Sequence, residues 1–114
     1  MADEIVYINF DEGVKRVMNN AKLYVKLLVK FKADTNLADT GTHLAAGDYE
    51  KAQVAAHTIK GIAANLSLTE LFERIRDLES QIKEKAVKPG AVDAVKAVYD
   101  ETVKKVDEVI AKYG

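Results

Sequence analysis

The sequence predicts an all-α fold, an antiparallel up-down four-helix bundle with a short N-terminal capping helix. One proline and six glycines in 114 residues leave little room for a loop-rich fold. Large apolar residues recur at spacings of three and four along most of the chain, which is the period of an amphipathic helix. Short turns separate four long stretches of this kind, and short connections join antiparallel neighbours. We expect residues 1–114 to form a single domain, because a chain of this length buries about two-thirds of its unfolded surface.

Residues 5–8, Ile-Val-Tyr-Ile, resemble a strand in isolation. Nothing else in the chain alternates with period two, so a strand here would have no partner. We therefore expect a lead-in that packs across one end of the bundle, followed by a short helix from about Asp11 to Met18. The pair Asn19-Asn20 predicts a turn, because asparagine tolerates the left-handed conformation. The buried side of the short helix is predicted to hold Phe10, Val14 and Val17.

A long helical stretch is expected from Ala21 to about Ala46. Residues 34–36 and 40–42 weaken it, because short polar side chains compete for backbone hydrogen bonds, so we expect a kink or break there. Gly47 and Asp48 then mark a boundary, as helix stop and as N-cap of the following helix. The apolar markers of the stretch are Leu23, Tyr24, Leu27, Leu28, Phe31, Leu37 and Leu44.

Two further helices complete the bundle. Residues 67–70, Ser-Leu-Thr-Glu, match a capping box and predict the start of one helix. Lys88-Pro89-Gly90 breaks the chain, and a last helix is expected from about Pro89 to Tyr113. Its heptad-like spacing is also compatible with a coiled-coil dimer, but three other amphipathic helices favour packing within one molecule. The predicted buried faces are Leu71, Phe72, Ile75, Leu78, Ile82 and Ala86, then Val92, Val95, Tyr99, Val103, Val106, Ile110 and Tyr113.

The stretch from Ala55 to Leu68 carries the candidate chemistry. At 100° per residue, His57 falls about 180° from the centre of the apolar stripe, on the most exposed line of the helix. Lys60 and Gly61 lie on the histidine's side, and Ala64 continues the same outer strip. The stripe that must face the core consists of Ala52, Ala55, Ile59, Ile62 and Leu66.

Gly61 is the least expected residue of this helix, because an internal glycine costs about 1 kcal/mol relative to alanine. Without a side chain at Gly61, the imidazole of His57 stands clear, so that another protein's surface can approach it. The alternative is that Gly61 lets a neighbouring helix pack closely, but the position points away from the core stripe.

The residues 56–61, Ala-His-Thr-Ile-Lys-Gly, followed by Ala-Ala-Asn-Leu at 63–66, resemble the signature of histidine-containing phosphotransfer (HPt) domains of two-component phosphorelays. The resemblance implies that His57 is the phosphoryl carrier and Lys60 its electrostatic partner. Gly61 would be the open position that admits a response-regulator receiver domain. We place Gln53 and Ala64 in the partner-binding surface.

The resemblance extends beyond this helix. It includes Phe10-Asp11, Gly13 and Arg16 in the first half, Gly-Asp at 47–48, and the Leu78-Glu79 pair. One departure is Ser67, where the family often has glycine; it concerns the turn at the end of the histidine helix and leaves the site itself intact.

A neutral imidazole nitrogen is nucleophilic near neutral pH, and the labile N–P bond it forms suits a carrier that hands its cargo on. Phosphoryl transfer also needs positioning and charge neutralisation, commonly from metal ions and acidic groups. This chain has neither a glycine-rich nucleotide loop nor a run of clustered carboxylates. The resemblance implies that a receiver domain supplies its aspartate and Mg²⁺. We therefore expect no cofactor in this chain, no ATP binding, and an upstream sensor histidine kinase as second partner.

The bulk composition limits the other partners. A net charge of −1, from 17 basic and 18 acidic residues, offers no electrostatic footprint for nucleic acid or for a membrane surface. The absence of cysteine and the acidic start, Met1-Ala2-Asp3-Glu4, without the layout of a signal peptide, favour a cytoplasmic protein. We expect a monomer, and Met1 and the short tail after Tyr113 favour a free-standing chain.

Two alternatives belong to other classes of protein. A non-catalytic helical adaptor or dimerisation module would explain the bundle and the balanced charge, but would leave the exposed His57 beside Gly61 a coincidence. A metal-binding bundle needs Glu-x-x-His pairs or several converging ligands, and no glutamate precedes either histidine by three residues. His43, near a helix end, is expected to serve the helix dipole or solvent.

Overall fold

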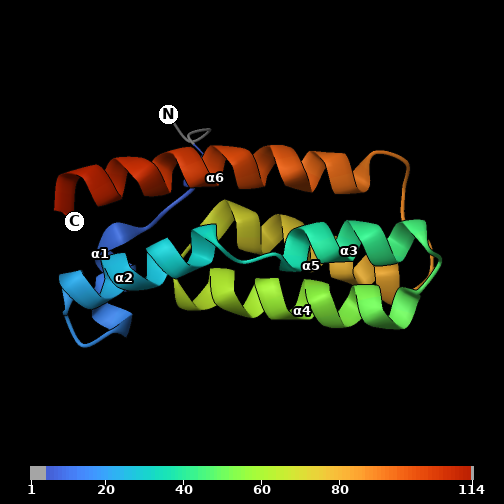
Figure 1. Cartoon of the computed structure of the whole chain (residues 1–114), viewed down its shortest axis with the longest axis horizontal. Helices are drawn as coiled ribbons and strands as arrows, with labels where there is room; N and C mark the ends of the chain where they lie inside the picture. The colour runs from blue at the N-terminus through green and yellow to red at the C-terminus, as the bar shows by residue number, and fades with distance from the viewer. Residues whose placement is uncertain (1–4, 114) are drawn as a thin grey trace.

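The computed structural model describes residues 5–113, and over this range it contains six helices and no strand (Figure 1). Two successive helices form one arm of the bundle, and three longer helices form the others, each running against the one before. This confirms the predicted all-α antiparallel bundle with a short N-terminal helix. Met1 to Glu4, on which the expectation about a signal peptide rests, lie outside the described residues. The helices are α1 (Phe10–Arg16), α2 (Ala21–Lys32), α3 (Asn36–Ala45), α4 (Tyr49–Asn65), α5 (Thr69–Lys83) and α6 (Ala91–Tyr113).

The lead-in and α1 close one end of the bundle. Residues 5–8 form no strand, as expected, and the backbone carbonyl of Val6 accepts a hydrogen bond from the Glu70 amide at 3.1 Å. The helix ends at Arg16, earlier than predicted, because Met18 and Asn19 adopt left-handed φ angles of 59° and 62°. A Cβ at the buried Gly13 would collide with the ring of Tyr24, so glycine allows α1 to approach α2 closely.

The arm formed by α2 and α3 is interrupted once, between these two helices. Asp34 Oδ1 accepts the backbone N–H of Asn36 at 2.8 Å, which ends the run of α2 and starts α3. The prediction of a kink or break at residues 40–42 is wrong, because α3 runs through these residues. The hydroxyls of Thr40 and Thr42 donate to carbonyls four residues back, and these bonds are compatible with the helix. The break lets α2 pack against α6 while α3 packs against α4.

The predicted capping box at Ser67 is also wrong. The N-cap of α5 is Leu68, and Ser67 lies in the preceding turn with a left-handed φ of 55°. Glycine adopts a left-handed φ more readily than serine does, so Ser67 occupies a turn position that suits glycine. The Ser67 hydroxyl donates to Glu12 at 2.7 Å and accepts from Arg16 Nε at 3.2 Å, so it links α1 to the α4–α5 turn.

The last two predicted helix boundaries also shift. The final helix begins at Ala91 and not at Pro89, because Gly90, with φ of 77°, separates the proline from the helix. Ala86 was predicted in the buried face, but it follows the end of α5 and is exposed.

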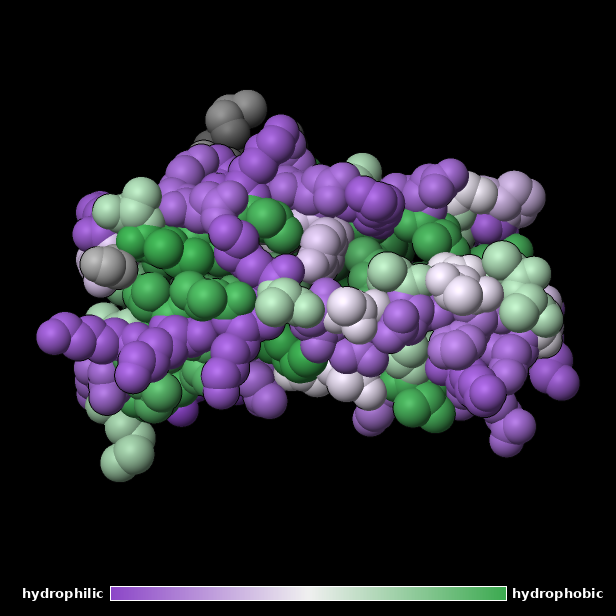
Figure 2. Space-filling model, viewed as in Figure 1, coloured by the Kyte–Doolittle hydropathy of each residue, from purple (hydrophilic) through white to green (hydrophobic). Residues whose placement is uncertain are grey.

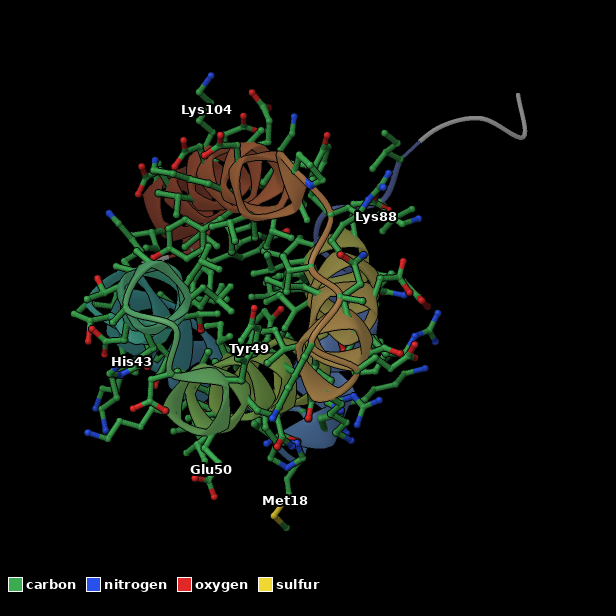
Figure 3. The ribbon with its side chains drawn as sticks, turned by 90° about the vertical axis from the view of Figure 1, so that its right-hand side faces the viewer. Met18, His43, Tyr49, Glu50, Lys88 and Lys104 are labelled. Carbon is green, nitrogen blue, oxygen red and sulfur yellow. The ribbon has the colours of Figure 1, made fainter. Side chains whose placement is uncertain are left out.

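Apolar side chains from α2, α4, α5 and α6 fill the interior. The end-on view of Figure 3 shows Tyr49 pointing inward while its neighbour Glu50 and Lys104 of α6 point outward. In Figure 2, apolar residues are visible between α6 and the α2–α3 arm. Over residues 5–113, no helix combines the length and apolar character that a membrane span requires. The largest fully buried apolar side chains are Tyr24, Phe31, Leu28, Ile59, Leu68, Leu71, Ile75, Leu78, Ile82 and Val106.

Candidate functional site

Helix α4 presents His57 to solvent. Asp48 caps the helix as predicted, its side chain accepting the Lys51 amide at 3.1 Å. The buried side of α4 consists largely of small residues, so its neighbours α3 and α5 pack closely on it. His57 lies on the opposite side with 68% of its side chain exposed, as the helical phase predicts. The buried residues are Ala52, Ala55, Ala56, Ile59 and Ala63, whereas Ile62 of the predicted stripe is only half-buried.

Gly61 faces open space. The residue is exposed, and a Cβ built on it would meet no atom of another element or neighbouring side chain of residues 5–113 within 4 Å. The close-packing explanation for this glycine is therefore wrong, since no helix approaches it. Gly61 thus leaves the surface one helical turn beyond His57 free. Ala64, one further turn along α4, is half-buried.

A buried carboxylate lies beneath the histidine. Glu79 of α5 has 2% of its side chain exposed, and its Oε2 lies 3.3 Å from His57 Nδ1. Gln53 Nε2 donates to the same oxygen at 3.4 Å, and the Lys83 ammonium lies 3.7 Å from it. The Lys60 ammonium lies 2.6 Å from Oε1. We call these five residues, Gln53, His57, Lys60, Glu79 and Lys83, the Glu79 cluster.

The cluster keeps Glu79 ionised. Burial alone raises the pKa of this carboxyl, but the contact with Lys60, the hydrogen bond from Gln53 and the positive charges of Lys60 and Lys83 outweigh that effect. The pKa of Glu79 therefore lies below its ordinary value. Within residues 5–113, Oε1 accepts no hydrogen bond that meets the usual geometry, and the ion pair with Lys60 is its partner there. The carboxylate is thus a fixed negative charge under an exposed imidazole.

This charge selects the histidine tautomer. A carboxylate accepts only, so the ring nitrogen that faces Glu79 carries the proton, as Nδ1–H. The other nitrogen, Nε2, then holds the lone pair on the exposed side of the ring. The arrangement can present a nucleophilic nitrogen to an incoming group and can stabilise positive charge that develops on the ring.

Sequence reasoning identified part of this site. It placed His57 and Lys60 on one side of the helix and Gln53 in the partner-binding surface, and the structure joins these three through Glu79. It assigned no role to Glu79 or to Lys83. A signal was present, because Glu79 stands four residues after Ile75 and next to Leu78, within the apolar stripe of α5. A charged residue in such a stripe needs a partner, and the neighbouring helix supplies it.

The other candidate features lie outside the cluster. His43 is in the last turn of α3, half-buried beside the groove between α3 and α4, and does not contact Glu79. An apolar groove of about 460 Å³ lies between α3 and α6, and its lining, which includes Leu37 and Val92, contains no residue of the cluster. Over the described range 5–113, no three histidine, aspartate or glutamate side chains gather in a way that could hold a metal ion.

Comparison with known protein families agrees with this geometry. The model of the Hpt domain matches residues 28–105, more than half of the chain, including every residue of the Glu79 cluster. Comparisons with curated proteins and with solved structures gave no match. Hpt domains have a phosphotransfer role in two-component systems, where they interact with receiver domains and kinases. The chain belongs to the Hpt domain family.

Proposed function

We propose that His57 accepts a phosphoryl group on Nε2 and passes it to or from an aspartate of a response-regulator receiver domain. The observation that carries this proposal is the pairing of an exposed imidazole with a buried carboxylate at 3.3 Å from Nδ1. Such a pairing directs the lone pair outward and leaves the proton inside.

In the transfer to this chain, the phosphoryl donor is the phosphorylated aspartate of the receiver. The Nε2 lone pair forms the N–P bond while the P–O bond to the aspartate breaks, and the electron pair leaves with the aspartate carboxylate. The ring keeps its Nδ1 proton and gains positive charge, which Glu79 offsets from below. The reverse reaction uses the same atoms in the opposite order.

Lys60 contributes charge and position. Its ammonium is held 2.6 Å from Glu79 Oε1, so it keeps the carboxylate in place and adds a fixed positive charge beside the histidine. We expect no cofactor in this chain and expect Mg²⁺ to be bound by the receiver domain. The receiver's aspartate and metal would complete the charge neutralisation that phosphoryl transfer needs.

The partner surface would centre on α4. Gly61 leaves the approach to His57 open, and the exposed Val54, 66% accessible, offers an apolar contact on the other side of the histidine. Gln53 and Ala64 would lie in the contact area. We propose a receiver domain and an upstream sensor histidine kinase as partners of a cytoplasmic monomer.

The test is transfer of label from a phosphorylated receiver domain to the wild type and to His57→Gln. We expect acid-labile label on the wild type and none on the variant. The matched control is His43→Gln, which should be labelled like the wild type because His43 lies outside the Glu79 cluster. Label that survives in His57→Gln would reject the assignment.

The same assay addresses the adaptor alternative. A helical adaptor would bind a partner without acquiring label, and His57→Gln would leave its binding unchanged. A wild type that binds a receiver but never becomes labelled would favour this alternative.

A further inference from the structure

The two lysines of the Glu79 cluster differ in how firmly they are held. Lys60 has 24% of its side chain exposed, and its ammonium lies 2.6 Å from Oε1. Lys83 has 57% exposed, and its ammonium lies 3.7 Å from Oε2, near the limit of an ion pair. Because the ammonium of Lys83 is largely solvated and lies farther from the carboxylate, Lys83 can leave Glu79 at smaller cost than Lys60 can.

Lys83 is also close to the histidine ring. Its ammonium and His57 Nδ1 face the same oxygen, so these two nitrogens are separated by no more than the sum of their distances to Oε2. The helices α4 and α5 run antiparallel (Figure 1), so the part of α5 that follows Glu79, which includes Lys83, runs toward the beginning of α4. Lys60 lies on α4 one turn beyond the histidine. The two lysines therefore approach the Glu79 carboxylate from opposite directions along the helix axis.

We infer that Lys83 is the residue that contacts the phosphoryl group, by moving its ammonium from Glu79 to a phosphoryl oxygen when His57 is loaded. The inference rests on the proposed role of His57. A phosphoryl group brings about 1.5–2 negative charges to the exposed side of the ring. The four-carbon stem of a lysine lets its point charge follow this new anion.

The departure of Lys83 leaves Glu79 paired. The carboxylate keeps Lys60 on Oε1, and it keeps Gln53 and the ring Nδ1–H on Oε2. The imidazole also becomes more positive when Nε2 is phosphorylated, which strengthens its own interaction with Glu79. The two lysines thus have separate roles: Lys60 positions the carboxylate of Glu79, and Lys83 binds the phosphoryl group.

The equilibrium between phosphorylated receiver and phosphorylated His57 tests this inference, because a contact to the loaded state changes the ratio of the two. We would measure this ratio and the single-turnover rate, over a range of receiver concentrations, for the wild type, Lys83→Gln and Lys96→Gln. Lys96 is a matched control, since it is an exposed lysine paired four residues on with Asp100, on a helix outside the cluster. We expect Lys83→Gln to lower the share of phospho-His57 about five-fold, Lys83→Arg to recover part of the loss, and Lys96→Gln to have no effect.

The same substitution in a Glu79→Gln background separates direct contact from an action through the carboxylate. We expect Lys83→Gln to lower the ratio there by a similar factor. An effect that disappears in this background would overturn the direct contact, as would an unchanged ratio in Lys83→Gln while the wild type and Lys96→Gln load normally. A change confined to the receiver concentration for half-maximal rate would indicate a docking residue and would also overturn it. A failure of the proposed function would give a different result: the wild type would acquire no label, or His57→Gln would keep it.

Discussion

Replacing Gly61 by glutamine should raise stability while it lowers phosphoryl transfer. Glycine inside a helix is less favourable than alanine by about 0.8–1.0 kcal/mol, and glutamine is a good helix former. In the described part of the chain no other element or neighbouring side chain lies within 4 Å of a Cβ at this position, so the new side chain meets no clash that would cancel the gain. We therefore expect Gly61→Gln to stabilise the fold by about 0.5 kcal/mol, or roughly 2–4 °C in Tm for a domain of this size.

The functional effect has the opposite sign. Residues four apart on a helix have Cβ atoms about 5–6 Å apart, so a glutamine side chain would stand beside the imidazole and obstruct a partner surface. Thermal unfolding followed by circular dichroism gives the first quantity, and single-turnover transfer from a phosphorylated receiver gives the second. Gly61→Ala is the control, because it removes the helix penalty with little added bulk and should retain most of the transfer. Transfer by Gly61→Gln at the wild-type rate would show that the partner docks elsewhere, and a loss of stability would refute the open-space argument.

Three further predictions concern the Glu79 cluster and the core. Lys60→Ala should slow transfer about ten-fold, near 1.4 kcal/mol on the barrier, with His57 still labelled at long times; an unchanged rate would make Lys60 an ordinary surface residue. The lowered pKa of Glu79 means that its carboxyl group loses its proton more readily in the folded state than in the unfolded state. The ionised carboxylate therefore contributes fully to stability above the ordinary glutamate pKa of about 4.3, and this contribution is lost as the pH falls below that value. Urea unfolding at pH 7 and pH 3.5 should therefore show a smaller acid-induced loss in Glu79→Gln than in the wild type. Tyr24→Phe should cost about 1–2 kcal/mol in urea unfolding, because it leaves the buried Leu66 carbonyl without the hydroxyl that donates to it at 2.5 Å.

The alkaline behaviour of Tyr24 tests the burial of its hydroxyl. Burial first, and the charge of Glu12 second, raise the pKa of Tyr24 to about 12. The unfolded state ionises this hydroxyl near pH 10 and the folded state does not, so stability should fall between pH 10 and 12. The fall should be smaller in Tyr24→Phe. Equal losses in both proteins would show that Tyr24 titrates like an exposed tyrosine.

The sequence by itself determined the elements and the outward position of His57. Helical period is a local property, so the apolar spacing on α4 sufficed to put His57 opposite the core side. Glycine has a known cost in any helix, and therefore Gly61 was recognisable as an unusual choice before its surroundings were known. Asp48 as N-cap and the break near Asp34 likewise depend on neighbours only two or three residues away.

Only the tertiary structure decided what lies beneath the histidine. Glu79 is separated from His57 by 22 residues, and its distance to Nδ1 depends on the register with which α5 packs against α4. The same packing decides that Lys60 is held by a carboxylate and that Lys83 is held only loosely. The left-handed turn at Ser67 was missed for a related reason, since its hydroxyl binds Glu12 and Arg16, more than fifty residues away, instead of capping α5. Local periodicity marks Glu79 as a charge within an apolar stripe, but it does not identify the partners of that charge, because only the packed bundle brings those side chains together.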